Sequence, residues 1–245
     1  MDQFLRTELL IGKDKVQKLK ESFVIVIGMG AVGSYSIEGI ARAGVGHIRI
    51  VDFDTIKSSN INRQLYALHS TLGEPKVEVA KKRILDINPR CQVETLHEFV
   101  SNDTLDKLLS GEPNIVIDAI DSLNPKVQLL TACFKKGLPV ISSMGAALRT
   151  DPAKICIADI FDTLNCPLAF QIRRRLRRNG VGRGITAVFS NEKVRQMRSG
   201  AIGEKEPNAY DRGRKRVTLG SLPTLTGIFG LIIANKTIEM LCDGF

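Results

Sequence analysis

Residues 24–54, VIVIGMGAVGSYSIEGIARAGVGHIRIVDFD, decide the fold class. An apolar run is followed by Gly-x-Gly-x-x-Gly, then by apolar residues at helical spacing, and then by a second apolar run that ends in acidic residues. This order is typical of a strand, a tight glycine turn, a helix and a second parallel strand that together bind a nucleotide. A nicotinamide-dependent dehydrogenase would begin in the same way, so this segment alone leaves the nucleotide open.

The chain beyond this segment continues the alternation of strands and helices. We predict helices over residues 75–87, 102–111 and 125–137, and strands over residues 92–100, 114–121 and 138–145. Such alternation indicates a Rossmann-like, doubly wound, mostly parallel sheet of the α/β class. After residue 150 the pattern loosens into an additional C-terminal region with strands over 153–160 and 186–190, a basic helix over 167–178 and a closing helix over 222–241.

Composition favours one domain without a targeting or membrane segment. The 245 residues are 43% hydrophobic and contain no Pro/Ser-rich linker, so we expect a single domain over residues 1–245. Within it, residues 1–150 are expected to form the nucleotide-binding core and residues 151–245 a substrate-side extension. The closing apolar helix is predicted to pack on the sheet and not in a membrane. Five scattered cysteines indicate reduced thiols and a cytoplasmic location.

The positive charge of the chain is concentrated after residue 170. A net charge of +9 suits an anionic partner. The helix over 167–178 carries five of the arginines, and the segment over residues 191–216, expected to be a mobile loop, adds further basic residues. The arginines of the first group are Arg173, Arg174, Arg175, Arg177 and Arg178, and Arg183 follows shortly after. A solvated basic surface is the alternative interpretation.

The glycine motif predicts a phosphate-binding turn. Gly28 allows the tight turn, Gly30 allows close approach of the backbone to phosphate, and Gly33 allows the helix to pack closely on the strand. The helix that follows presents amide groups and a positive dipole to an anion. Asp52 ends the next strand, where a carboxylate accepts hydrogen bonds from a ribose.

The segment after Asp52 favours ATP over a dinucleotide. It carries polar and charged residues that we expect at the carboxyl edge of the sheet, and a lysine opens the next helix. These residues are Asp54, Asn60, Asn62, Arg63, Gln64 and Lys76. Hydride transfer leaves the phosphates untouched, whereas splitting ATP between the α- and β-phosphates requires cations at the transferring group. Asp118 and Asp121 end a later strand, and one of them could hold Mg²⁺.

Together these segments resemble the ubiquitin-activating-enzyme-like ThiF/MoeB superfamily. The motifs are GMGAVGS, ARAGVGHIRIVDFD, SSNINRQ, GEPKVEVAKKRILDINP and VIDAIDS, and they cover residues 5–145. RTELLIG, NINRQLYAL, AIDSLNPKVQL and GSLPTLTGIFG are most similar to the branch of tRNA threonylcarbamoyladenosine dehydratases.

The resemblance implies a role for each matching residue. Gly28, Gly30 and Gly33 would line the ATP site and Asp52 would bind the ribose. The nucleotide and phosphate site would be shaped by Asp54, Asn60 and Gln64. Arg63 and Lys76 would stabilise charge during adenylyl transfer, and Asp121 would be the acid linked to Mg²⁺. Arg6, in the leading helix, would reach the ATP of a partner across a homodimer.

The sequence departs from the wider superfamily in two features, a structural zinc site and a catalytic cysteine, and these narrow the expected function. MoeB- and ThiF-type enzymes carry two CxxC pairs for structural zinc, and this sequence contains no CxxC, so no structural zinc is expected. A catalytic cysteine is also not supported. Cys166 is the best thiol candidate, but its position favours a small buried residue at the start of a helix.

The resemblance implies ATP-dependent dehydration of N6-threonylcarbamoyladenosine at position 37 of tRNA. The carboxylate would be adenylated with loss of pyrophosphate, and the carbamoyl group would then close a ring and release AMP. The basic helix and the segment 191–216 would contact the anticodon arm. The family association also implies a cysteine desulfurase or sulfur-acceptor system as a partner. The alternatives are adenylation of a ubiquitin-like sulfur carrier and a non-catalytic nucleotide-binding module. A nicotinamide-dependent dehydrogenase is the interpretation that agrees least with these motifs.

Overall fold

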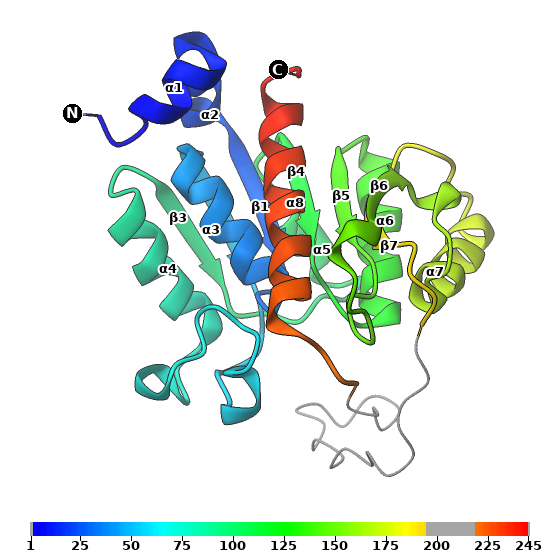
Figure 1. Cartoon of the computed structure of the whole chain (residues 1–245). Helices are drawn as coiled ribbons and strands as arrows, with labels where there is room; N and C mark the ends of the chain where they lie inside the picture. The colour runs from blue at the N-terminus through cyan, green and yellow to red at the C-terminus, as the bar shows by residue number, and fades with distance from the viewer. Residues whose placement is uncertain (1, 195–218, 245) are drawn as a thin grey trace.

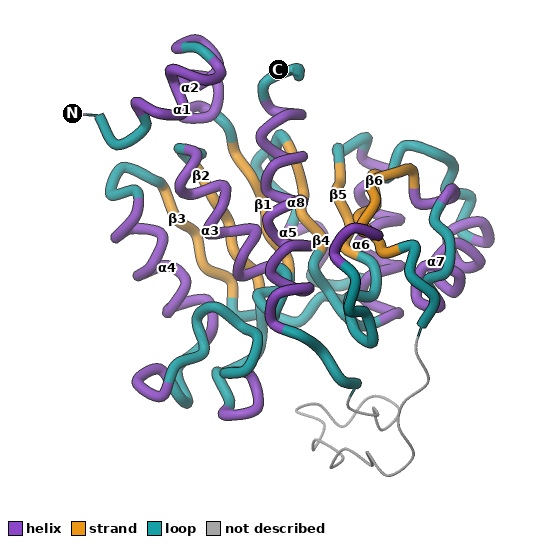
Figure 2. The backbone as a smooth tube through the Cα atoms, viewed as in Figure 1, coloured by secondary structure: helices purple, strands orange, loops and turns teal. Residues whose placement is uncertain are grey.

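A single mixed sheet forms the centre of the molecule. The computed structural model describes residues 2–194 and 219–244. The strands are β1 (Phe23–Ile27), β2 (His47–Val51), β3 (Gln92–Leu96), β4 (Ile115–Asp118), β5 (Val140–Ser143), β6 (Ile155–Asp159) and β7 (Thr186–Ser190). Their order is β3-β2-β1-β4-β5-β7-β6, and only the β6–β7 pair is antiparallel (Figure 2). The predicted Rossmann-like, mostly parallel α/β fold is therefore confirmed.

Helices cover both faces of this sheet. They are α1 (Leu5–Ile11), α2 (Lys13–Glu21), α3 (Gly33–Ala43), α4 (Lys76–Ile87), α5 (Leu105–Leu108), α6 (Leu123–Lys136), α7 (Pro167–Arg178) and α8 (Pro223–Leu241). Short 3-10 helices are η1 (Ser58–Asn60), η2 (His69–Thr71), η3 (Pro152–Lys154) and η4 (Ile160–Asp162). In Figure 1, α3, α4 and α8 lie on the face toward the viewer.

The alternation of side chains along β1 produces two apolar cores. Val24 and Val26 belong to the core with α3, α4 and α8, whereas Ile25 and Ile27 belong to the core with α5, α6 and α7. Successive side chains of a strand point to opposite faces, so a strand that is apolar throughout must be covered on both. This explains the unbroken apolar run of the sequence at residues 23–27.

The closing helix α8 is a core element. By length and composition it is the one helix among residues 2–194 and 219–244 that could cross a membrane. Phe229 and Ile233 are nevertheless buried in the core beside α3, and the Ser36 hydroxyl donates a hydrogen bond to the Gly230 carbonyl 3.1 Å away. The predicted packing of this helix on the sheet layer is therefore confirmed.

Several predicted elements are shorter than expected. The strands predicted over residues 114–121, 138–145 and 153–160 are reduced to β4, β5 and β6. The strand predicted over residues 92–100 ends at Leu96, because its partner β2 ends opposite at Val51. The helix predicted over residues 102–111 is reduced to α5, since the Thr104 side chain instead closes a turn by accepting from the Ser101 amide and donating to the Phe99 carbonyl. Side-chain bonds of this kind compete with helical hydrogen bonds.

The sheet places a ligand site between β1 and β4. Chain order reverses there, because β2 and β3 follow β1 on one side while β4 and β5 lie on the other. In open α/β sheets ligands bind outside the carboxyl ends of the strands at such a reversal. The loops that leave β1 and β4 both end at this edge.

Candidate active site

The glycine turn after β1 needs glycine at two of its three positions. Gly28 has φ +91°, and a side-chain Cβ there would lie 2.7 Å from the Ala119 carbonyl oxygen. A Cβ on Gly33 would lie 1.8 Å from the Gly28 carbonyl oxygen. A Cβ on Gly30 would meet only the Gln64 side chain, at 3.8 Å. Gly28 and Gly33 therefore allow the close packing of the turn. Gly30 instead leaves open space beside the turn, next to the Gln64 side chain.

Asp52, directly after β2, stabilises this turn through hydrogen bonds. Its Oδ2 accepts the Met29 amide at 2.7 Å, and its Oδ1 accepts the Asp54 amide at 2.8 Å. Burial raises the pKa of the Asp52 carboxyl, although the nearby charge of Lys76 and the two amides act in the opposite direction. Asp52 thus orients the loops after both β1 and β2, a structural contribution that the sequence does not reveal.

Lys76 and Asp54 form an ion pair at the same edge. Lys76 is the first residue of α4, and its Nζ lies 3.0 Å from the Asp54 Oδ2. Its backbone amide also donates to the Asp54 carbonyl at 3.1 Å. Lys76 is only 5% exposed, so the ammonium is held in one place and is close to Asp52 as well. A fixed, poorly hydrated cation is suited to binding phosphate.

The segment with Asn60, Arg63 and Gln64 is a tight turn docked on α3. Asn60 is buried, and its carbonyl accepts the amides of Arg63 (3.1 Å) and Gln64 (2.9 Å). The Arg63 guanidinium donates to the Ser59 carbonyl at 2.9 Å. The Tyr66 hydroxyl donates to the Ser34 carbonyl at 3.1 Å and joins the turn to the first turn of α3. The turn therefore brings the Gln64 side chain next to Gly30, whereas the Arg63 guanidinium is bound within the turn itself, to Ser59 and Asn62.

The loop after β4 distinguishes Asp118 from Asp121. Asp118 is completely buried: its Oδ2 lies 2.8 Å from the Lys126 Nζ and accepts from the Ser142 hydroxyl at 2.6 Å. Asp121 is exposed, with its Oδ1 3.3 Å from the Ser122 hydroxyl oxygen. The two acids therefore differ in accessibility, and of the two only Asp121 is exposed to a ligand.

Lys126 is a site-supporting residue that the sequence analysis missed. Its Nζ pairs with Asp118 and also donates to the Ile120 carbonyl at 2.9 Å, so it holds the loop that carries Asp121. The loop in turn touches the glycine turn, since Ala119 is the neighbour that excludes a side chain from Gly28. A lysine eight residues after an acidic strand end, on the apolar side of a helix, is the signal that could have identified it.

Arg6 is not brought to this edge within one chain. It lies on α1, which Figure 1 places at the opposite end of the strands from the loops after β1 and β4. Its predicted contact with ATP would therefore have to come from a second copy of the chain.

The arginines of the basic region divide into two groups. Arg173 donates to the Thr163 carbonyl at 2.7 Å, Arg175 donates to Asn124, and Arg183 binds Asp162 in bidentate fashion. Arg174, Arg177 and Arg178 are exposed on α7. Residues 195–216 of the predicted basic segment 191–216 lie outside the described residues.

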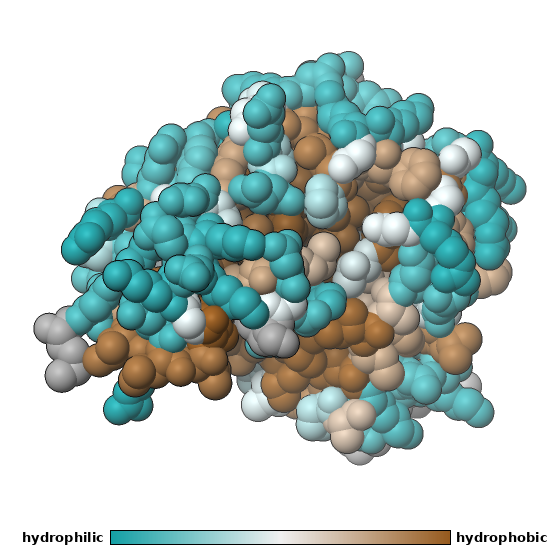
Figure 3. All heavy atoms as spheres, turned by 90° about the horizontal axis from the view of Figure 1, so that it is seen from above, coloured by the Kyte–Doolittle hydropathy of each residue, from teal (hydrophilic) through white to brown (hydrophobic). Residues whose placement is uncertain are grey.

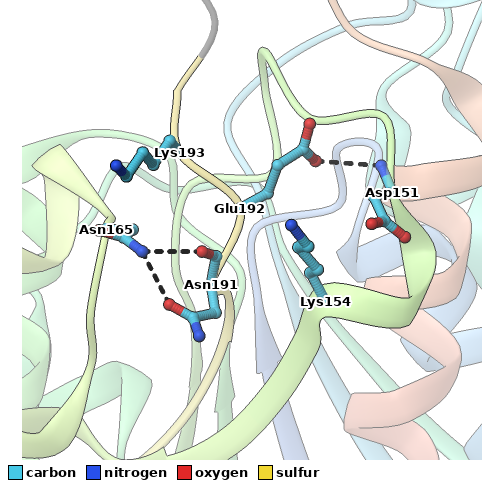
Figure 4. A pocket seen from close by; sticks show the side chains of 6 residues that line it. All are labelled: Asp151, Lys154, Asn165, Asn191, Glu192 and Lys193. Carbon is cyan, nitrogen blue, oxygen red and sulfur yellow. Dashed lines mark hydrogen bonds between the residues drawn. The ribbon is translucent and has the colours of Figure 1, made fainter.

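A polar cleft of about 470 Å³ opens beside the end of β7 (Figure 4). It is lined by Asp151, Lys154, Asn165, Asn191, Glu192 and Lys193. The Glu192 carboxylate accepts the Asp151 amide at 3.0 Å, and the Asn165 side-chain amide donates to the Asn191 carbonyl at 2.8 Å. These contacts join the loop after β5, the start of α7 and the exit of β7 into one wall.

The cysteines have structural surroundings. All five thiols are free. Burial raises the pKa of Cys133 to about 12, which disfavours a nucleophilic thiolate. Cys166 is buried at the start of α7, where its Sγ accepts the Ala169 amide at 3.4 Å, as expected of a small residue at a helix start. In the part of the chain that the structure describes, no three His, Cys, Asp or Glu side chains are grouped as a metal site.

Comparison with known proteins gives consistent matches over nearly the whole chain. The ThiF family model matches residues 4–244. The tRNA threonylcarbamoyladenosine dehydratase of Bacillus subtilis is 46% identical over 99% of this chain and 96% of its own length. The crystal structure of the Escherichia coli tRNA N6-threonylcarbamoyladenosine dehydratase in complex with ATP has a TM-score of 0.86 and 32% identity, covering 98% of this chain and 93% of that one.

A second kind of relative matches only part of the chain. The molybdopterin-synthase adenylyltransferase of Escherichia coli is 34% identical over 138 residues, which are 56% of this chain. The similarity to the tRNA-modifying enzymes therefore includes the region with α7 and α8, whereas the similarity to this adenylyltransferase does not extend over the whole chain.

Proposed function

The chain belongs to the ThiF family, and from this premise we propose that it dehydrates N6-threonylcarbamoyladenosine in tRNA at the expense of ATP. The observation that carries the proposal is the full-length similarity to the Bacillus dehydratase. A relative that shared only the adenylation core with this chain would be similar to it over residues 1–150. It would differ from this chain in the substrate-side extension at 151–245.

The arrangement at the carboxyl edge supports a reaction in two steps. A carboxylate oxygen of the threonylcarbamoyl group attacks the α-phosphorus of ATP, the bond to the β-phosphate oxygen breaks, and pyrophosphate leaves. The carbamoyl group of the same substrate then attacks the acyl carbon, closes the ring and displaces AMP. The nucleophile of the second step belongs to the substrate, which agrees with the buried, protonated state of Cys133.

The chain's own residues bind and orient ATP and neutralise its charge. The space in front of Gly30 and the amides at the start of α3 suit a phosphate. Asp52, held against the glycine turn, has oxygen lone pairs left for ribose hydroxyls, and Asp54, Asn60 and Gln64 shape the surrounding loops. Lys76 and Arg63 supply positive charge for the departing pyrophosphate.

Asp121 is the residue we assign to Mg²⁺. Mg²⁺ binds through one or two carboxylates with phosphate oxygens and water, so an exposed acid beside the phosphate site fits it without a cluster of protein ligands. When bound, the ion neutralises charge on the phosphates of ATP.

AMP release tests the proposal. The protein is incubated with ATP, Mg²⁺ and tRNA that carries threonylcarbamoyladenosine, or with a ubiquitin-like sulfur carrier in place of the tRNA. We expect AMP only with the tRNA, and AMP only with the carrier would overturn the proposal. Lys76→Ala should abolish release, whereas Lys82→Ala on the exposed side of the same helix is the matched control.

Adenylation of a sulfur carrier is the second candidate function. The match to molybdopterin-synthase adenylyltransferase, which covers 56% of this chain, is the observation that favours it. A non-catalytic nucleotide-binding module is less well supported, because it would not require Lys76 and Arg63, whose positive charge suits the departing pyrophosphate.

We further propose that α7 contacts the anticodon arm and that the protein is a homodimer. Arg174, Arg177 and Arg178 are the exposed cations of α7. Leu9 and Leu10 on α1 are 78% and 84% exposed, and Figure 3, which looks down on the end that carries α1, shows apolar patches on this surface. A partner copy would cover these leucines and accept Arg6. A cytoplasmic location and a sulfur-relay partner stay predictions.

A further inference from the structure

We propose that Phe170 is a stacking platform for an unpaired nucleobase of the tRNA, an inference that rests on the proposed function. Phe170 lies in the first half of α7 and is 55% exposed. The helix does not need it for packing, because Ala169, Ile172 and Leu176 form the buried side. An aromatic ring left exposed on a helix that already has a complete apolar face is available to a ligand.

The ring forms part of a cleft that is distinct from the glycine turn. This cleft, of about 370 Å³, is lined by Asn165, Cys166, Pro167, Phe170, Arg173, Lys193 and Val194. It shares Asn165 and Lys193 with the polar cleft of Figure 4. The Phe170 end of the combined groove is therefore mainly apolar, the other end is polar and carries Lys154, and Lys193 lies where the two clefts meet.

The exposed arginines continue from Phe170 along the same side of α7. Arg174, Arg177 and Arg178 follow Phe170 by four, seven and eight residues, which places them on one face of a helix. Single-stranded nucleic acid is bound by this combination, with bases stacked on aromatic rings and phosphates neutralised by nearby cations. The charge of this face favours RNA over an apolar protein segment, which would leave the arginines desolvated.

The groove lies at the edge of the sheet where ATP is expected. β7 runs parallel to β5, so its end at Ser190 lies at the same edge as the ends of β5, β4 and β1. Asn165, just before α7, is hydrogen-bonded to Asn191 at this edge. A nucleobase stacked on Phe170 would thus lie close to the reacting nucleotide of the tRNA. We therefore assign this base to the anticodon loop, whose bases are unpaired.

Binding of the modified tRNA to the full-length protein tests this assignment. Phe170→Ala should weaken binding by about 5- to 150-fold, the range for loss of one base–aromatic stack, and should leave the salt dependence unchanged. Phe170→Trp should restore binding, because it keeps a ring. Arg174→Gln should reduce the slope of log K against log[salt] by about 1. Phe134→Ala is the matched control, since Phe134 on α6 is also exposed, at 37%.

The outcomes separate the inference from the proposed function. Wild-type affinity in Phe170→Ala, while the wild type releases AMP with the modified tRNA, would overturn the stacking role alone. Equal weakening in Phe170→Ala and Phe134→Ala would do the same. A change in sedimentation of Phe170→Ala without loss of RNA binding would assign the ring to a second copy of the chain. A wild type that neither binds nor uses the tRNA would overturn both.

Discussion

Lys126 and Asp118 form an ion pair in which the Nζ and Oδ2 atoms are 2.8 Å apart and neither side chain is exposed to solvent. Asp118 ends β4, and Lys126 is the fourth residue of α6. The remaining bonds of the pair go to Ser142 on β5 and to the backbone of Ile120. The pair therefore fixes the loop that carries Asp121 and that packs on Gly28.

Removal of one partner of this pair should destabilise the fold. Lys126→Met leaves the Asp118 carboxylate buried without its counter-charge, and we expect the free energy of unfolding to fall by about 3–5 kcal/mol. In the double variant Lys126→Met, Asp118→Asn the loss should be largely recovered. Urea denaturation of the three proteins measures both effects, and a Lys126→Met variant as stable as the wild type would refute the structural role.

Two glycines of the same turn should respond differently to alanine. Gly30→Ala places a methyl group in open space, so we expect an unchanged melting temperature and ATP binding weakened by about tenfold, or 1.4 kcal/mol. Gly33→Ala would place its methyl group against the Gly28 carbonyl, and we expect a loss of about 1–3 kcal/mol in stability. Thermal melting and ATP titration separate the two results. Equal effects on stability would contradict the assignment of Gly30 to the ligand side.

The pH dependence of stability should include a contribution from Glu38. Burial alone would raise the pKa of this carboxyl, but hydrogen bonds from Arg83 and Arg42 outweigh burial and hold the pKa below its ordinary value of 4.5. The group therefore stabilises the fold above about pH 4.5, and this stabilisation is lost as the pH falls through the folded pKa.

Glu38→Gln measures this contribution. Because the two arginines are about half exposed, we expect the variant to be less stable by only about 1 kcal/mol at pH 7. The difference from the wild type should shrink toward acidic pH in urea denaturation. A difference that grows on acidification would show that the sign is wrong.

Arg6 should act across a dimer if the proposed assembly is correct. Neither Arg6→Ala nor Lys76→Ala should be active alone, because each lacks one part of every site. Mixing the two variants should restore activity to about a quarter of the wild-type value, since half of the dimers are mixed and each then has one complete site. AMP release from the mixture is the measurement, and a mixture as inactive as its components would argue against an arginine supplied by the partner.

The periodic parts of the fold could be predicted from the sequence because they follow from local rules. The apolar run at β1, the glycine turn and the Pro75–Lys76 start of α4 each depend on a few neighbouring residues. The end of β3 could not be predicted in this way, because it depends on where β2 ends. The shortened α5 likewise depends on a side-chain hydrogen bond that competes with the helix.

Some site residues could likewise be predicted from local sequence, whereas others depend on tertiary packing. Gly28 and Gly33 belong to one sequence motif, and their close neighbours are set by that motif and the loop after β4. Lys126 has a place in the sequence that hints at burial, but its partner could not be predicted, because the ion pair with Asp118 forms only when β4, β5 and α6 are packed together. Arg173, counted with the basic surface, instead donates to Thr163, because the folded chain brings the η4–α7 connection over it.

Transfer of a labelled oxygen tests the central claim most directly. The threonylcarbamoyl carboxylate of the tRNA is labelled with ¹⁸O, and the protein is supplied with ATP and Mg²⁺. If the carboxylate attacks the α-phosphorus and ring closure then displaces AMP, one labelled oxygen must appear in AMP, and the nucleoside must lose the mass of one water molecule. Label in inorganic phosphate or pyrophosphate, or cyclised nucleoside with unlabelled AMP, would contradict adenylation of the carboxylate.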